Sequence, residues 1–171
     1  IWTVHNSNLP SDDIETIQID ADGNVWIGTY DYILMRQDGT GWTEIDIPFD
    51  ENWLGSSLPL LYDLEIAEDG SFWLGTNNGL WHWKNGTWEV FNSLSGNLSN
   101  GPNNNKFWQV EELNGKIYFS EKELFEKNNT ETINLTDLYP ELSIPIGRGY
   151  LSTSNNKVIV SNKYNYVASI D

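Results

Sequence analysis

Short apolar runs, each preceded by a turn signal, recur along the whole chain. The most apolar runs cover residues 25–27, 72–74, 117–119 and 158–160. Runs of this kind are typical of strands that are covered on both faces. Asp-Gly, Asn-Gly or Asn-Asn pairs stand just before them, and such pairs favour hairpin turns because Gly and Asn adopt positive φ at low cost. No window of a dozen residues shows helical periodicity, so the pattern predicts an all-β chain.

The same pattern returns at a fixed distance. Residues 17–29 reappear as residues 64–76 without a gap, at an offset of 47 residues, with Asp-Gly, Trp and Gly-Thr in register. Weaker copies cover residues 110–120 and 151–161. A second landmark, a strand that starts with Trp, occurs at residues 2–7, 42–45 and 88–93, with a degenerate version at 131–134.

Each copy is interpreted as four short strands. A repeat of 40 to 50 residues with four strands is typical of a β-propeller blade. The sequence therefore predicts one propeller domain over residues 1–171, with blades at about 12–46, 60–92, 107–136, and 149–171 together with 1–6. A β-sandwich is the rival fold, but it would not repeat the same register of thirteen residues.

The ends of the chain bear on ring closure. The last repeat supplies three strands, and the first residues supply a strand without a blade of its own. Pairing residues 2–5 with the final blade would close a ring of four four-stranded blades and remove two exposed edges. The alternative is that the chain forms half of a larger propeller. The first residue is Ile rather than Met, which indicates a processed product or a fragment.

Repeated aromatic and glycine positions indicate packing rather than chemistry. Trp26 and Trp73 recur in the second strand of their repeats, and Trp42 and Trp88 recur in the fourth strand. Aromatic residues at blade spacing are expected in the core between blades. Gly28 and Gly75 are expected where the backbones of two elements approach closely.

The first two repeats resemble a known family. Asn-Leu-Pro-Ser at residues 8–11 and Asp-Gly-Asn-Val-Trp-Ile-Gly-Thr at 22–29 resemble the two-component regulator propeller repeat. The second copy keeps Leu-Pro at 58–59, the Asp-Gly to Gly-Thr stretch at 69–76, and Gly-Leu at 79–80. The resemblance weakens over residues 107–171, where Ser120 and Ser161 replace Gly, and Tyr118 and Ile159 replace Trp.

This resemblance implies a role in sensing. In that family the repeats build extracytoplasmic sensor regions of hybrid histidine kinases, chiefly in Bacteroidetes, and also secreted or surface-attached propellers. It implies detection of glycans or protein partners, and a periplasmic, cell-surface or secreted location. The membrane helix and kinase domain that accompany the known sensors are not found in these 171 residues.

Charge and composition limit the classes of molecule that the protein is expected to bind. The formal net charge is −16, from 25 acidic and nine basic residues. This argues against nucleic acid or an anionic membrane surface as partner, because both need clustered Lys and Arg. No apolar run is long enough for a membrane helix, so membrane insertion is not expected. The absence of Cys excludes disulfides and thiolate chemistry.

Neither a metal nor a cofactor is expected. Residues 20–24 read Asp-Ala-Asp-Gly-Asn, like the start of a calcium loop, but Asp31 stands where such a loop needs Glu. The second copy loses two of the oxygen ligands, so we interpret the segment as a turn. His5 and His82 are the only histidines and look like ordinary blade residues. With no serine nucleophile motif and no definable carboxylate pair, the sequence favours a protein that is not an enzyme.

Loops at the ends of rigid blades are the expected place for binding. Aromatic rings can stack on sugars while Asn and Asp side chains bond to hydroxyl groups. The candidate ligand-binding residues chosen on this ground are Tyr30, Asp31, Tyr32, Trp53, Asn77, Asn78, Arg148 and Tyr164.

Three functional hypotheses remain open. The first is a non-catalytic recognition or scaffold module of the bacterial cell envelope that binds a poly- or oligosaccharide or a protein. The second is a structural unit that associates with another copy, as a homodimer, or with the remainder of a longer propeller chain. The third is a propeller lyase or glycoside-cleaving enzyme.

Overall fold

The chain folds almost entirely into short antiparallel strands. The structure is a computed structural model, and it describes residues 3, 5–48, 60–92, 106–120, 123–128, 130–139, 150–161 and 167–170. The strands within these residues are β1 (Ile14–Ile19), β2 (Val25–Thr29), β3 (Leu34–Gln37), β4 (Trp42–Ile45), β5 (Leu61–Ile66), β6 (Phe72–Thr76), β7 (Gly79–Lys84), β8 (Thr87–Phe91), β9 (Gln109–Leu113), β10 (Lys116–Ser120), β11 (Leu124–Lys127), β12 (Thr132–Asn134), β13 (Tyr150–Ser154), β14 (Lys157–Ser161) and β15 (Val167–Ile170).

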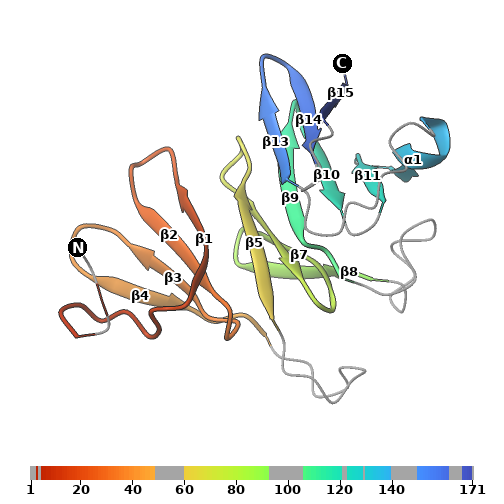
Figure 1. The fold of residues 1–171 in the computed structure, drawn as a ribbon. Coiled ribbons are helices and arrows are strands. Elements are labelled where there is room, and N and C mark those ends of the chain that lie inside the picture. The colour runs from red at the N-terminus through yellow and green to blue at the C-terminus, as the bar shows by residue number, and fades with distance from the viewer. Residues whose placement is uncertain are drawn as a thin grey trace.

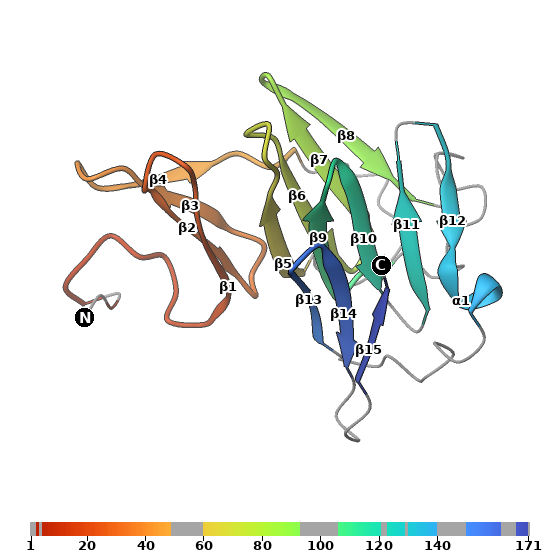
Figure 2. The same cartoon turned by 90° about the horizontal axis from the view of Figure 1, so that it is seen from above.

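The strands form four meander sheets in chain order. The sheets are β1-β2-β3-β4, β5-β6-β7-β8, β9-β10-β11-β12 and β13-β14-β15. All neighbours within a sheet are antiparallel. Figures 1 and 2 show the sheets following one another as separate blades. The predicted all-β propeller fold with four blades is therefore confirmed.

Apolar clusters lie between successive blades, where the doubly covered strands predicted them. Trp26 and Leu34 of the first sheet pack with Leu64 and Phe72 of the second. The cluster between the second and third sheets contains Trp73, and the cluster between the third and fourth contains Tyr118. Removing a large side chain from water contributes about 2 to 3 kcal/mol, so this stacking holds the blades together.

The tryptophan predictions hold in different degrees. Trp26 and Trp73 in the second strands are 9% and 7% exposed, as expected of core residues. Trp88 of β8 is partly buried and packs against the cluster between the first two blades. Trp42 of β4 is also only partly buried.

Close contacts with the next blade explain two glycines. A Cβ on Gly75 would lie 2.7 Å from the carbonyl oxygen of Phe107, and one on Gly28 would lie 2.4 Å from Leu61 Cδ2. Both contacts are shorter than a real Cβ contact. Gly75 therefore lets the backbone of the next blade approach, as the sequence predicted, whereas Gly28 makes room for the Leu61 side chain and not for a backbone.

The first strand of each blade is the inner strand, and inner strands meet in series. Contacts join β1 with β5, β5 with β9, and β9 with β13. Within the described residues, no comparable contact joins the first sheet with the fourth. The blades thus form an open arc (Figures 1 and 2).

The predicted closing strand is only partly visible. Trp2 and Val4 lie outside the described residues. Thr3 belongs to a turn, because its carbonyl oxygen accepts hydrogen bonds from the Asn6 and Ser7 backbone N–H groups. Among the described residues, this segment does not pair with β15, and the fourth sheet has three strands.

One short helix was not predicted. Helix α1 (Leu135–Leu138) follows β12 directly, and the Asn134 side chain caps it by accepting from the Thr136 N–H. Four residues are too few to produce a helical period in the sequence.

Candidate functional site

Five of the eight predicted ligand residues lie within the described part of the chain. Tyr30, Asp31 and Tyr32 form the turn between β2 and β3, and Asn77 and Asn78 form the equivalent turn between β6 and β7. The other three, Trp53, Arg148 and Tyr164, lie outside the described residues. The five residues therefore belong to the corresponding end of two neighbouring blades.

Two of these residues, Asn77 and Tyr32, have structural roles. Asn77 Oδ1 accepts a hydrogen bond from Leu60 N, and Asn77 N donates to Leu60 O, which fixes the entry to β5. The Tyr32 ring packs edge-on against Trp81, with 6.5 Å between the ring centroids. Burial raises the pKa of the Tyr32 hydroxyl well above its usual range. Tyr32 is thus better suited to packing between blades than to contact with a ligand, whereas Asp31 is exposed.

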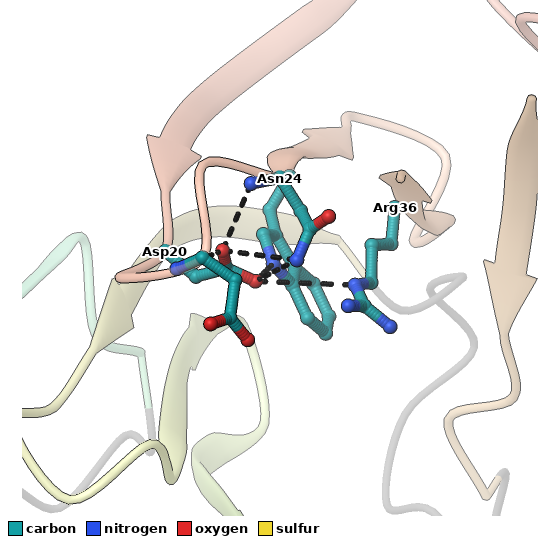
Figure 3. A network of polar contacts seen from close by, with 5 residues as sticks. Asp20, Asn24 and Arg36 are labelled. Atoms are coloured by element: carbon teal, nitrogen blue, oxygen red, sulfur yellow. Dashed lines mark hydrogen bonds and ion pairs between the residues drawn. The ribbon is translucent and has the colours of Figure 1, made fainter. Parts of the chain in front are cut away.

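In the turn that resembles a calcium loop, N–H groups of the same blade donate hydrogen bonds to the Asp20 carboxylate (Figure 3). Asp20 Oδ1 accepts from the backbone N–H groups of Asp22 and Asn24, and Oδ2 accepts from Trp26 Nε1 at 2.8 Å. The Asn24 amide bonds to both oxygens, and Arg36 Nε lies 3.9 Å from Oδ2. Burial acts to raise the Asp20 pKa, but the Trp26 and Asn24 hydrogen bonds outweigh it and lower the pKa. This carboxylate organises the hairpin, as the interpretation as a turn predicted.

A cavity of about 410 Å³ lies between the second and third blades. Its walls come from the turn between β5 and β6, from β7 and β8, and from the third sheet. The lining residues are Ala67, Glu68, Asp69, Ser71, Trp73, His82, Lys84, Glu89, Phe91, Glu112, Gly115, Ile117, Lys127 and Asn128. None of the five described candidate residues is among them, and Asn77 and Asn78 lie at the opposite end of β6 and β7.

Aromatic rings form the floor of this cavity. The His82 ring stacks on Trp73, with 4.0 Å between centroids and 13° between planes. Trp73 also packs against Phe91 at 5.6 Å, and Lys127 Nζ lies 4.5 Å from the centroid of the Phe91 ring. Such a cation over a ring is stabilised by the negative face of the ring. The floor is therefore apolar, with cationic and imidazole nitrogens at its edge.

Charged groups surround the floor. Lys84 Nζ lies 2.6 Å from Asp69 Oδ2, and this hydrogen bond is the main cause that holds the Asp69 pKa well below its usual range. Burial lowers the pKa of His82, against the opposing charge of Asp69, so that imidazole is neutral at pH 7. Burial also lowers the pKa of Lys127. The cavity consequently offers hydrogen-bond donors and acceptors close together.

The sequence contained a signal for one residue of this cavity, His82. The residue opposite the second-strand aromatic is Arg36 in the first blade, His82 in the second and Glu126 in the third. Arg36 lies over Trp26 at 5.6 Å, and Glu126 accepts from the Tyr118 hydroxyl at 3.0 Å. In these three blades the cross-strand position varies while its partner stays aromatic, which would have marked it as a position free to take a blade-specific role.

A second group of polar residues lies along the inner strands. Asp63 and Glu65 of β5 and Glu111 of β9, called here the inner carboxylates, reach the inner strands of neighbouring blades. Asp63 Oδ1 accepts from the Thr16 hydroxyl at 3.2 Å, and Asp63 Oδ2 accepts from Val110 N at 3.0 Å. Glu65 accepts from Gln18 Nε2 at 3.3 Å and from Glu112 N at 3.2 Å. Glu111 accepts from the Thr153 hydroxyl at 3.4 Å.

The inner carboxylates titrate at unusually high pH. Burial raises the pKa of Glu65 to about 8, and the charge of Glu111 adds to the effect. Burial and the charge of Asp63 raise the pKa of Glu111 to about 7. Burial raises the pKa of Asp63 to about 6, against hydrogen bonds from Val110, Leu64 and Thr16. These groups join blades together, and their protonation changes near neutral pH.

Metal and membrane sites were also considered. Within the described residues, no group of three or more His, Cys, Asp or Glu side chains is arranged to hold a metal ion. In the same part of the chain, no helix is long and apolar enough to cross a membrane.

Comparison with known proteins supports the sequence resemblance. Residues 8–31 match the two component regulator propeller family. This match confirms the resemblance over the first repeat. No curated protein matches the chain.

Solved structures share the fold. The extracellular domain of a hybrid two component system from B. thetaiotaomicron has a TM-score of 0.68 and 20% identity, covering 98% of this chain and 23% of that chain. The extracellular domain of a second hybrid two component system from that organism has a TM-score of 0.71 and 15% identity, and the match covers 98% of this chain and 22% of that chain. Virginiamycin B lyase from Staphylococcus aureus has a TM-score of 0.61 and 16% identity, and the match covers 92% of this chain and 55% of that chain. The chain thus spans less than a quarter of the two extracellular domains, and at these identities the likeness shows the fold alone.

Proposed function

We propose that the chain is a non-catalytic recognition module of the cell envelope that binds a glycan in the cavity between the second and third blades. The observation that carries this proposal is the composition of the cavity wall. At the base of the cavity the partly buried His82 ring stacks on the buried Trp73, and both donors and acceptors border it. Saccharides need this combination, because their C–H faces pack on rings while their hydroxyls bond to polar side chains.

The size of the cavity also fits this proposal. A volume of about 410 Å³ lies within the range of small-ligand sites, which is about 300 to 1,000 Å³. The extracellular sensor domains that share the fold support a location outside the cytoplasm. We propose a periplasmic, cell-surface or secreted location on this ground.

The experiment is a thermal-shift screen of the purified chain against plant, algal and host oligo- and polysaccharides. A ligand that binds the folded state raises the midpoint in a concentration-dependent way. We expect Glu89→Gln to weaken that rise, because Glu89 is an exposed residue of β8 on the cavity wall. Glu44→Gln, at an exposed position of β4 outside the cavity, is the matched control.

The screen also tests the loops that the sequence suggested. If Asp31→Asn weakens the stabilisation and Glu89→Gln does not, the glycan binds at the turns between the second and third strands. In that case the cavity proposal fails and the earlier prediction for Tyr30, Asp31 and Asn78 gains support. A flat response to every saccharide would refute glycan binding and direct the search to protein partners.

A lyase is the second candidate, because His82 lines the cavity and a propeller lyase shares the fold. A catalytic imidazole is normally oriented by a hydrogen bond to one ring nitrogen. Within the described residues no hydrogen bond holds the His82 nitrogens, and stacking on Trp73 positions the ring instead. Time-dependent release of product from a stabilising saccharide, lost in His82→Gln, would establish the enzyme and refute the binding-only role.

A further inference from the structure

Two positions of the repeat distinguish the cavity between the second and third blades from the interface before it. Phe72 and Ile117 begin the matching apolar runs 72–74 and 117–119. Phe72 pairs with Trp83 on the next strand. Ile117 pairs with Lys127 in the same way. The third blade therefore has an aliphatic and a charged residue where the second blade has two aromatic residues.

Aromatic rings fill this place at the interface between the first and second blades. The Phe72 ring stacks on Trp83, with 4.9 Å between centroids and 12° between planes. It also lies 5.2 Å from the Trp26 ring of the first blade. Ile117 and Lys127 carry no ring, and the cavity of about 410 Å³ lies beside them. Because protein interiors are close-packed, a planar aromatic group is the shape that this interface lacks.

Lys127 places a charge at a position that is apolar in the neighbouring blades. The matching residue is Trp83 in the second blade and Ile170 in the fourth. Ile170 matches because it pairs with Val158, which begins the apolar run 158–160. Trp83 and Ile170 both pack against the apolar cluster of their own interface. A charge at a partly buried packing position costs free energy unless it has a partner, so Lys127 indicates a binding role.

The Lys127 ammonium group forms no ion pair in the described part of the chain. An ammonium group has three N–H donors. One of them reaches the Asn128 carbonyl oxygen at 3.2 Å, and the group lies over the Phe91 ring. The ion pairs among the described residues are formed by Arg36, Lys84 and Lys116 instead. The Lys127 ammonium can therefore donate to an anionic group inside the cavity that it lines.

Carboxylates on the cavity wall limit how much negative charge a ligand can carry. They belong to Glu68, Asp69, Glu89 and Glu112. Asp69 is already paired with Lys84. The exposed Glu89 acts on Lys127 through its charge but does not form an ion pair with it. These groups would repel a ligand with several anionic groups, so a single carboxylate beside Lys127 is the charge that fits.

We infer that the cavity takes a ligand with an aromatic ring and a single carboxylate. The ring would occupy the space that corresponds to Phe72 and Trp83 at the preceding interface, and the carboxylate would accept hydrogen bonds from Lys127 Nζ. An apolar pocket with one well-placed charged group is typical of sites for small ligands. The group could belong to a free aromatic acid or to the aryl end of a saccharide derivative. The inference goes beyond the proposed glycan function and does not depend on it.

Isothermal titration calorimetry of the full chain with benzoate tests this inference. Benzamide keeps the ring but lacks the charge, and cyclohexanecarboxylate keeps the charge but lacks the aromatic ring. We expect benzamide to bind about tenfold more weakly than benzoate, because the charge-assisted hydrogen bond is lost. Cyclohexanecarboxylate should bind about threefold more weakly or worse. Absence of benzoate binding at millimolar concentration, or equal binding of benzamide, would overturn the inference.

Variants of Lys127 locate the site. Lys127→Gln should weaken benzoate binding about tenfold and leave benzamide binding unchanged, and equal affinity for benzoate in parent and variant would overturn the inference. Lys157→Gln, at an exposed position of β14 outside the cavity, is the matched control and should bind benzoate like the parent. Lys127→Trp supplies the residue of the preceding interface and should raise the thermal midpoint while it abolishes benzoate binding. If Lys127→Trp does not fold, Lys127→Gln decides the question.

An aryl glycoside distinguishes the two sources of the ligand. Tighter binding of 4-carboxyphenyl glucoside than of benzoate supports a saccharide that carries the aryl acid, and weaker binding supports a free aromatic acid. Benzoate binding together with a flat saccharide screen would refute the glycan proposal and support this inference. Saccharide binding that Glu89→Gln weakens, without benzoate binding, would do the reverse.

Discussion

Stability of the folded chain should fall as the pH rises from about 5 to 8, because the inner carboxylates favour their protonated forms. The pKa of Glu65 rises from 4.5 to about 8 and that of Glu111 from 4.5 to about 7 on folding. Between these limits the folded state binds more protons than the unfolded chain, so deprotonation favours unfolding. Acidification within this window therefore stabilises the stacked blades.

The loss in the free energy of unfolding can be worked out from the pKa change and the burial of Glu65. A pKa change is worth 1.36 kcal/mol per pH unit, but Glu65 is only partly buried and solvent screens its charge. We therefore expect about 2 kcal/mol to be lost at Glu65 between pH 5 and pH 8. The neighbouring charges of Glu111, Asp63 and Glu112 are the electrostatic cause, in addition to burial.

Glu65→Gln isolates this contribution. The neutral amide can still accept from Glu112 N, and Gln18 can turn its own amide to satisfy the other side. The variant should be about 1 to 2 kcal/mol more stable than the parent at pH 8 and about equal at pH 5. Urea denaturation followed by tryptophan fluorescence at several pH values measures the difference.

Other titratable groups also change the stability with pH, but they do so equally in the parent and in Glu65→Gln. Asp20, Asp38 and Asp69 have lowered pKa values, so they stabilise above about pH 4 and lose that effect only below it. Burial lowers the His82 pKa, so protonation of His82 destabilises the fold as the pH falls below 6.5. Both effects are common to the parent and the variant. If Glu65→Gln is less stable than the parent at pH 8, the reasoning is refuted.

Three further predictions concern the turns and the blade contacts. Asp20→Ala should lower the free energy of unfolding by about 2 kcal/mol, because Trp26 Nε1 and the turn amides lose their acceptor; urea denaturation measures this, and an unchanged value would contradict the role of Asp20. Calcium or a chelator should leave the thermal midpoint unchanged, since the Asp20 oxygens already accept from protein donors; a calcium-dependent rise would show that the turn is an ion site. Gly75→Ala should cost about 2 kcal/mol, because the new Cβ would meet the Phe107 carbonyl oxygen; an unchanged urea midpoint would show that the third blade shifts freely.

The repeat predicted most of the fold because each of its features depends on residues that are close together in the sequence. Asp22 and Gly23 set the first hairpin, the apolar run around Trp26 sets the covered strand, and Gly28 allows close packing, all within eight residues. Drift in the third and fourth copies did not hide the blades, since Gly115 and Asn156 still adopt the positive φ that the turn requires.

The cavity could not be predicted because its walls come from distant segments. In the first blade Asp20 binds Trp26 Nε1, whereas Ala67 stands at that position in the second blade and leaves room beside Trp73. That loss was visible in the aligned repeats. The opposite wall, which includes Lys127, belongs to the third sheet, and nothing local in the sequence shows that it faces His82.

The serial arrangement of the inner strands has a consequence for cooperativity. Among the described residues the main contacts between sheets join neighbours in the chain, so the free energy of this part of the array is divided among three interfaces. Detachment of the fourth sheet would expose the cluster around Tyr118 and leave the clusters around Trp26 and Trp73 intact. The chain can therefore open from one end, blade by blade, with the cavity between the second and third blades still formed after the first step.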